Sequence, residues 1–248
     1  MTKLFRNIRK SLLNDGKTSK YLKYALGEIV LVVIGILIAL QINNWNEHRK
    51  LQKEEIKILM GIKTDLKSTL IELETALNWN SESVNHIKKI KTFLKNDLSY
   101  DKELDNSFGI LPHVYQPFIT KTTYGSLQSL GINIIQNDSL KNNIIDMYDV
   151  VFPNILDYHK DEDLFKNQVI LPYYSKHIEY EPEISVYTAS PNNFDELKKD
   201  KSSVNIIGLT MRVRIRGVEK YNNSLELIRN LVKSIEDELK LRGYDKIL

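Results

Sequence analysis

The chain has 248 residues, of which 42% are hydrophobic and 27% charged, and its formal net charge is +3 at pH 7. This length is sufficient for a domain with its own core, and the absence of cysteine excludes disulfides and thiol chemistry. Residues 1–24 hold seven Lys or Arg residues and one Asp, so the positive charge is concentrated at one end. The net charge therefore gives no sign of nucleic-acid binding, and we expect no nucleic-acid partner.

Residues 1–20 form a basic leader. Its apolar residues recur at helical spacing between basic ones, which predicts an amphipathic helix lying on an anionic membrane surface. A disordered leader that only sets the membrane topology would have the same composition, and both interpretations stay open. Either way, about twenty residues are too few for a catalytic or signalling domain in the cytoplasm.

The most apolar segment is Ile29–Leu40, and its flanks extend it to residues 22–42. A helix of this length reaches across a hydrocarbon core of about 30 Å. Its Leu, Ile and Val residues contribute about −4 to −7 kcal/mol to insertion, which outweighs a cost of about 2.5–3.5 kcal/mol for charged Glu28. A cleaved signal peptide would need a better cleavage site than residues 38–41, and a buried core helix would not need the basic flank. We predict a transmembrane helix over residues 21–45.

The charge asymmetry also predicts orientation. Cytoplasmic flanks carry the excess of Lys and Arg, so we expect the N-terminus in the cytoplasm and the large C-terminal part on the other side. Interface anchors are expected at both ends of the span, namely Lys20, Lys23 and Tyr24 on the cytoplasmic side and Trp45 on the outer side.

Glu28, Gly35 and Ala39 fall on one face of the spanning helix at 100° per residue. Small residues allow a second helix to approach closely, and a carboxylate within the membrane prefers a protein contact to lipid. We therefore predict an intramembrane helix-contact face, with proton linkage at Glu28 as a further hypothesis. Alternatively, Glu28 extends to the headgroups or bonds Tyr24.

After Trp45 the pattern becomes that of long amphipathic helices. Apolar residues from Leu59 to Ile87 predict a helix of up to fifty residues that continues from the span as a stalk, with Gly61 as its weak point. Further helices are expected over residues 120–130, from Asp138 to Leu171 with a kink at Pro153, and from Ile207 to Leu239 with Gly243 as C-cap.

The segments between these helices, residues 97–119 and 172–203, are expected to be irregular surface connections. No strand pattern is apparent. The predicted fold class is all-α, with one N-terminal transmembrane helix continuing into the stalk and an extracytoplasmic antiparallel helical bundle over residues 46–248.

Several segments resemble one known family. Residues 23–29 read Lys-Tyr-Ala-Leu-Gly-Glu-Ile, residues 35–46 read Gly-Ile-Leu-Ile-Ala-Leu-Gln-Ile-Asn-Asn-Trp-Asn, and further matches are Phe5-Arg6, Ile8-Arg9, Gly16-Lys17, Thr123-Tyr124, Leu127, Gly131 and Leu140. Together they resemble a large family from Bacteroidetes-type bacteria, catalogued as domain of unknown function 6090. The resemblance is most specific over residues 5–46. It implies a single-pass protein of the bacterial inner membrane with a periplasmic helical domain, and it carries over no activity.

No motif for catalysis or metal binding stands out. The five histidines are scattered, and the acidic run of residues 157–163 lacks the spacing of a calcium loop, so we expect a solvated charged face there. Arg212, Arg214 and Arg216 are expected to form salt bridges at the surface or bundle edge. We predict no catalytic residue, no metal and no cofactor.

The sequence also holds a group of tyrosines, namely Tyr173, Tyr174, Tyr180 and Tyr187. They suit a contact surface for protein or glycan, or else half-buried packing. The expected function is that of a non-enzymatic interaction or scaffold module of the cell envelope, and a hydrolase is disfavoured. The alternative is a ligand-sensing bundle that relays a signal through the span. Expected partners are the lipid bilayer and a second copy or an unidentified membrane or envelope protein.

Overall fold

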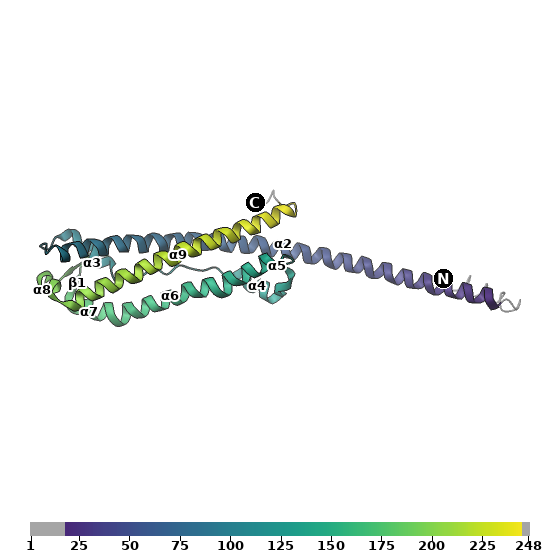
Figure 1. The fold of residues 1–248 in the computed structure, drawn as a ribbon, viewed down its shortest axis with the longest axis horizontal. Coiled ribbons are helices and arrows are strands. Elements are labelled where there is room, and N and C mark those ends of the chain that lie inside the picture. Colours follow the sequence, from purple (N-terminus) through teal and green to yellow (C-terminus); the bar gives the residue numbers. More distant parts are fainter. Residues whose placement is uncertain (1–17, 245–248) are drawn as a thin grey trace. The chain divides into compact units, whose positions relative to one another are not determined.

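The computed structural model describes residues 18–244, which divide into two compact units with the boundary between Glu55 and Ile56. Residues 1–17 of the predicted leader, residues 1–20, lie outside the described residues, as do the side chains of Lys20 and Tyr24. The first element, helix α2, runs from Thr18 to Lys95 (Figure 1). Its N-terminal part is long and apolar enough to cross a membrane, and the described chain buries none of that apolar window.

The second unit begins with the remainder of α2 and is almost entirely helical, which confirms the predicted all-α class. Its elements after α2 are η1 (Lys102–Leu104), α3 (Asp105–Ile110), α4 (Thr122–Leu130), η2 (Ile132–Ile134), α5 (Asp138–Asp146), η3 (Met147–Val151), α6 (Phe152–Phe165), η4 (Lys166–Ile170), α7 (Leu171–His177), β1 (Ile178–Tyr180), β2 (Ala189–Pro191), α8 (Phe194–Lys199) and α9 (Lys201–Leu241).

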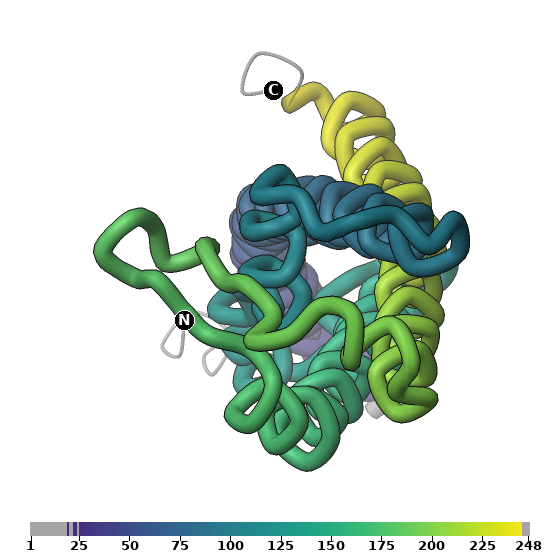
Figure 2. The backbone as a smooth tube through the Cα atoms, turned by 90° about the vertical axis from the view of Figure 1, so that its left-hand side faces the viewer, coloured from purple at the N-terminus to yellow at the C-terminus, as the bar shows by residue number. Residues whose placement is uncertain are grey.

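Three long helical rods pack around a common centre within this unit, as the end-on view shows (Figure 2). They are α2, the near-continuous helix from α5 to α7, and α9. Ion pairs Lys67–Glu236 and Glu74–Arg229 show that α9 runs antiparallel to α2. The rod from α5 to α7 runs parallel to α2, because the chain first returns along α2 (Figure 1). Of the three rods, only α9 is therefore antiparallel to the other two, so the predicted antiparallel arrangement holds for α9 alone.

The returning segment, residues 111–121, lacks regular structure and is held by polar side chains of α2. The Tyr115 hydroxyl and the Phe118 amide both donate to Glu72 Oε2, each at 3.1 Å. The Thr123 amide donates to Asp65 Oδ2 at 2.8 Å, so a carboxylate on α2 caps the N-terminus of α4. Side chains of α2 thus provide hydrogen-bond partners for backbone amides that have no neighbouring strand to bond.

The core consists of two apolar clusters along the rods. One includes Leu59, Ile144 and Ile228 at the end with α4 and α5. The other includes Ile90 and Phe108 at the end with α3 and the β-hairpin. On each rod the residues between the two clusters are partly polar, and these polar side chains meet in the interior.

The rod from α5 to α7 contains two π-helical segments, η3 and η4. Pro153 and Pro172 each follow one of them by two residues. Proline cannot donate the normal backbone hydrogen bond and crowds the preceding turn, and a wider turn relieves both conflicts. The helix therefore continues through Pro153. The rod begins at α5, where the side chain of the N-cap residue Asn137 accepts from the Leu140 amide at 3.1 Å.

Residues 172–203 are more ordered than the predicted connection. They hold α7, an antiparallel β-hairpin that pairs Ile178 with Pro191, α8 and the start of α9. The strands have three residues each, too few for a recognisable alternation. Gly109 of α3 packs on the hairpin loop so closely that a Cβ atom would lie 1.8 Å from the Tyr187 carbonyl oxygen.

Gly61 is not a weak point of α2. A Cβ atom there would lie 2.7 Å from Cγ2 of Thr123, so the glycine allows α4 to approach α2 closely. This contact stands beside the hydrogen bond from Thr123 to Asp65 and fixes the start of α4 on α2.

Candidate functional site

Two of the three residues of the predicted intramembrane face, Gly35 and Ala39, are uncovered by the described chain. Ala39 is exposed, and a Cβ atom built on Gly35 would meet nothing within 4 Å. Glu28 is half-buried and has an interaction within the chain. These three residues share one helix face, as their spacing requires, and a contact there with a second helix stays a prediction.

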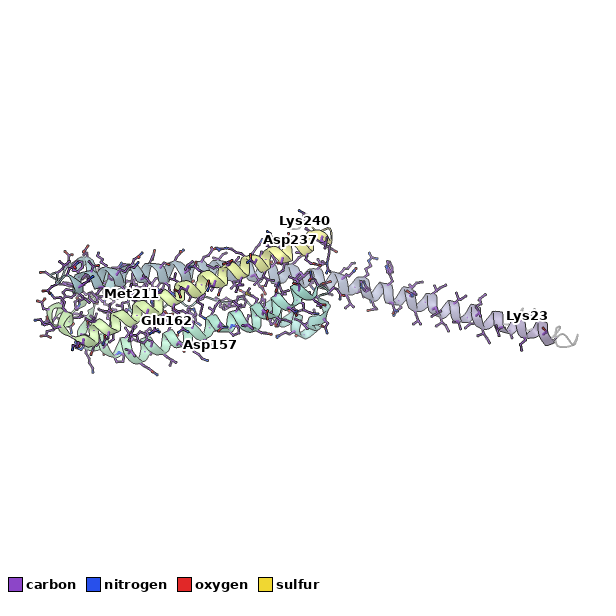
Figure 3. The ribbon with its side chains drawn as sticks, viewed as in Figure 1. Lys23, Asp157, Glu162, Met211, Asp237 and Lys240 are labelled. Carbon is purple, nitrogen blue, oxygen red and sulfur yellow. The ribbon has the colours of Figure 1, made fainter. Side chains whose placement is uncertain are left out.

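The two predicted interface anchors whose side chains are described are both exposed. Lys23 is exposed near the start of α2 (Figure 3). Trp45 is 65% exposed, and the Arg49 guanidinium lies 5.8 Å from the centre of its ring. The role of Lys23 and Trp45 as anchors at a membrane interface stays a prediction.

The acidic run on α6 is only partly the solvated face that the sequence predicts. Asp157 is exposed, but Glu162 on the same helix is buried, as are Tyr158 and His159 (Figure 3). Positions 158, 159 and 162 fall on one side of a helix, and that side faces the core. The expectation of a charged surface was therefore wrong for these three residues.

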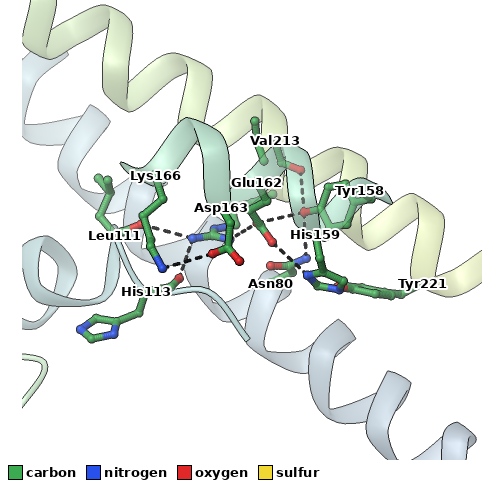
Figure 4. Close-up of polar contacts among 11 residues, drawn as sticks. Asn80, Leu111, His113, Tyr158, His159, Glu162, Asp163, Lys166, Val213 and Tyr221 are labelled. Carbon is green, nitrogen blue, oxygen red and sulfur yellow. Dashed lines mark hydrogen bonds and ion pairs between the residues drawn. The ribbon is translucent and has the colours of Figure 1, made fainter. Parts of the chain in front are cut away.

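Arg214 also departs from the prediction. Arg212 and Arg216 are exposed, whereas Arg214 is 1% exposed and is not a surface or bundle-edge residue. Its Nη1 forms a buried ion pair with Glu162 Oε1. Its Nη2 donates to the carbonyl oxygens of His113 at 2.6 Å and Leu111 at 3.3 Å (Figure 4). One guanidinium thus joins α9 to α6 and to the returning segment.

Tyr158 extends this polar cluster toward α2. Its hydroxyl accepts from Asn80 Nδ2 at 3.4 Å, and its proton faces Glu162 Oε1 at 3.0 Å and the Val213 carbonyl oxygen at 3.2 Å (Figure 4). Burial is the main reason that the pKa of Tyr158 lies above its usual value. The side chain is therefore a neutral hydroxyl at physiological pH, and it links all three rods.

His159 and Tyr221 complete the cluster. The Tyr221 hydroxyl and His159 Nε2 lie 2.6 Å apart, and burial raises the pKa of Tyr221, so this hydroxyl keeps its proton and can donate it. His159 Nδ1 and Glu162 Oε2, 3.5 Å apart, have no hydrogen-bond partner among the described residues. A tautomer with the proton on Nδ1 directs it at this carboxylate oxygen.

This arrangement favours a structural role for these residues over a catalytic or ligand-binding role. The charged groups Arg214 and Glu162 face each other, and five surface hollows of the second unit are lined by residues other than Arg214, Glu162 and His159. Within residues 18–244, no group of three or more His, Cys, Asp or Glu residues is arranged to hold a metal ion. We call Asn80, Tyr158, His159, Glu162, Arg214 and Tyr221 the buried polar cluster.

A signal for Arg214 was present in the sequence. Core positions of α9 advance by three or four residues through Ile207, Met211, Arg214, Gly217 and Tyr221. If the apolar Ile215 is assigned to the core in place of Arg214, the pattern stays apolar but no longer follows this buried face of the helix. Ile215 is in fact 39% exposed. Helical geometry, and not residue polarity, identifies the buried position.

The four tyrosines fit the half-buried alternative. Tyr174 is buried, with its hydroxyl donating to the Phe108 carbonyl oxygen at 3.2 Å, and the Tyr173 hydroxyl donates to Asp200 at 2.7 Å. The Tyr187 ring contacts those of Trp79 and His113 at centroid distances of 5.7 and 5.0 Å. Tyr180 is the most exposed of the four, at 37%.

The close packing around the cluster generates a first prediction. A Cβ atom on Gly217 would lie 2.2 Å from Asn80 Nδ2 and 2.3 Å from the Tyr158 hydroxyl, whereas one on Gly208 of the same helix would meet nothing within 4 Å. Gly217→Ala should destabilise the chain by about 1–3 kcal/mol through overpacking, and Gly208→Ala should stabilise it by about 0.5–1 kcal/mol through helix propensity. Thermal unfolding of the full chain in detergent measures both. A melting temperature of Gly217→Ala at or above that of the unmodified chain would contradict the prediction.

The buried ion pair generates a second prediction. Removing one partner leaves a buried charge, so Arg214→Met or Glu162→Gln alone should cost about 3–5 kcal/mol. The double variant should be less destabilised than the sum, by about 0.5–3 kcal/mol. The exposed pair Arg229–Glu74, 2.7 Å apart, is the matched control and should lose at most about 1 kcal/mol per substitution. Additive losses at Arg214 and Glu162 would show that the two side chains do not interact.

Comparisons with curated proteins and with solved structures find no match for this chain. A comparison with family models matches residues 28–169 to the family of unknown function DUF6090. The matched region holds the predicted intramembrane face and the part of the buried polar cluster that lies on α2 and α6, while Arg214 and Tyr221 lie beyond it. Since the match covers more than half of the chain, the protein belongs to the DUF6090 family.

Proposed function

We propose that the protein is a membrane-anchored, non-enzymatic interaction module of the bacterial cell envelope. In this proposal the N-terminal part of α2 crosses the inner membrane once, the leader lies in the cytoplasm and the helical bundle lies in the periplasm. The bundle presents its surface to an envelope protein, and the spanning helix associates laterally.

The observation that carries the proposal is the contrast between the two units. Side chains from Ile29 to Lys50 are exposed throughout, including a long apolar run that the described chain does not cover. The second unit, by contrast, has two buried apolar clusters, its exposed apolar side chains are scattered, and most groups of its polar cluster bond partners within the unit. An uncovered apolar helix is stable only in contact with lipid or with a partner helix. A bundle whose interior is filled can contact a partner only through its outer surface.

A ligand-sensing function is the second candidate. The observation that favours it is that α2 is one helix from Thr18 to Lys95, so that the segment assigned to the membrane and the α2 side chains of the bundle belong to one element. Against it, most of the polar groups that converge inside the bundle bond one another, and none of the five surface hollows described above is lined by a residue of the buried polar cluster.

The membrane topology is the first property to test. Because the sequence has no cysteine, a single introduced cysteine is the only thiol that a maleimide can label. A single cysteine in the leader, Ser11→Cys, should be protected from a membrane-impermeant maleimide in spheroplasts. A cysteine at exposed Lys160→Cys of α6 should react. The physical reason is the excess of Lys and Arg in residues 1–24, which favours the cytoplasmic side. Labelling in the reverse order, or of both sites equally, would contradict the proposed orientation.

Lateral association is the second test. Gly35→Leu with Ala39→Leu should lower the dimer fraction of the full chain in lipid bilayers, measured by energy transfer between labelled copies, because larger side chains keep a second helix away. Val30→Leu with Val33→Leu, on other faces of the helix, is the control and should leave the dimer unchanged. Co-purification from native membranes then separates a second copy from an envelope partner. Recovery of monomer alone, with no other protein, would remove the support for an interaction module.

A further inference from the structure

A groove lies between the last turns of α2 and the first turns of α9, within the second unit. It has a volume of about 370 Å³ and is lined by Lys91, Leu94, Lys95, Lys198, Val204 and Ile207 among others. This volume lies within the range of about 300–1,000 Å³ that small-molecule sites occupy. Neither the buried polar cluster nor the predicted intramembrane face contributes a residue to it.

The floor of the groove is apolar. Ile207 belongs to the second core cluster, and Leu94 packs against that cluster while half-exposed. Val204, in the first turn of α9, is 45% exposed. The groove therefore leaves apolar surface in contact with water beside an otherwise buried core, and covering this surface would be favourable because it removes apolar area from water.

The rim of the groove is positively charged. Lys91 and Lys95 stand one turn apart on α2, both are exposed, and neither forms an ion pair with a residue in the part of the chain that the structure describes. Lys198 differs, because its ammonium lies 2.7 Å from Asp97 Oδ1 and 3.0 Å from Asp195 Oδ1. The two α2 lysines thus supply the charge that remains uncompensated at the groove.

The wall of the groove is fixed by the way α2 ends. The Leu98 amide donates to the Phe93 carbonyl oxygen at 3.0 Å, and Asp97 has a φ of 51° in the left-handed region that ends a helix. Lys198 donates to the Asp97 carboxylate and, at 3.3 Å, to the Leu98 carbonyl oxygen, which ties this turn to α8. The groove is therefore preformed, and a ligand would not need to order it.

We propose that this groove binds a single-chain anionic amphiphile, namely a fatty-acid carboxylate. The carboxylate contacts the ammonium groups of Lys91 and Lys95, and the acyl chain covers Leu94, Val204 and Ile207. Basic residues near a helix C-terminus also complement the helix dipole, which accounts for the lysines but not for the uncovered apolar floor beside them. An acyl chain with one negative headgroup matches both features. This inference does not depend on the proposed scaffold function.

Photo-crosslinking tests the proposal on the full chain in nanodiscs of zwitterionic phospholipid. The probe is a fatty acid with a diazirine in its acyl chain, and mass spectrometry maps the adducts. We expect adducts within residues 91–95 and 204–207, which unlabelled fatty acid of the same length suppresses and the corresponding fatty alcohol does not. Lys91→Gln with Lys95→Gln should lower the adduct yield on the order of tenfold, since it removes both charge-assisted contacts.

Matched variants distinguish binding at the groove from a general effect of positive charge on the adduct yield. Lys233→Gln with Lys240→Gln removes two exposed positive charges from the far part of α9 and should leave the yield unchanged. Val204→Asp places a carboxylate on the apolar floor and should abolish the adducts, with circular dichroism confirming the fold. Adducts confined to residues 25–45, adducts insensitive to the Lys91 and Lys95 substitutions, or equal competition by the alcohol would each overturn the proposal. Suppression by an acidic peptide but not by fatty acid would also overturn it, in favour of a protein partner.

Discussion

The buried ion pair between Arg214 and Glu162 is the interaction on which the second unit depends. Each charge pays a desolvation penalty of several kcal/mol, and only close geometry with further hydrogen bonds compensates it. Here the guanidinium also binds two backbone carbonyls, and the carboxylate also receives the Tyr158 hydroxyl. Such a pair tolerates little displacement of α6 against α9. It therefore sets the register of these two rods more strictly than the apolar side chains around it could.

The same guanidinium explains the path of the chain between α3 and α4. A segment without regular structure must satisfy its backbone groups, and residues 111–121 do so with side chains of the rods. Arg214 binds the carbonyls of Leu111 and His113, and Glu72 receives the Phe118 amide. This return along α2 brings the chain back before α5 begins. As a result α2 and the rod from α5 to α7 run in the same direction, and α9 alone is antiparallel.

For function, the important contrast is between buried polar groups that bond one another and apolar side chains that no part of the described chain covers. Most groups of the buried polar cluster bond one another or nearby backbone carbonyls, so the cluster stabilises a single arrangement of helices. The apolar side chains of residues 29–42 are exposed, and the groove beside Lys91 and Lys95 leaves Val204 and part of Leu94 uncovered in the described chain. The first is long enough for a membrane. The second is small and rimmed by positive charge, which favours a small anionic amphiphile over a protein surface.

Much of this protein follows from the sequence alone. The apolar segment at Ile29–Leu40, the long α2 and α9 helices, the all-α class, and the ends of α4 and α9 near Gly131 and Gly243 depend on residues close together in the chain. Local periodicity and glycine at a positive φ are sufficient to indicate them. The family resemblance rests on the same local segments.

Other features were decided by tertiary structure. The local sequence predicts Arg214 at the surface, because a charged side chain is buried only where distant partners compensate it. These partners stand 52, 103 and 101 positions away. The cap of α4 is Asp65, on another helix, and the return of residues 111–121 makes α2 and α6 parallel. In each case the deciding contact joins residues that are far apart in sequence. Local sequence patterns determined which segments form helices, and long-range pairing of buried polar groups determined how those helices are arranged.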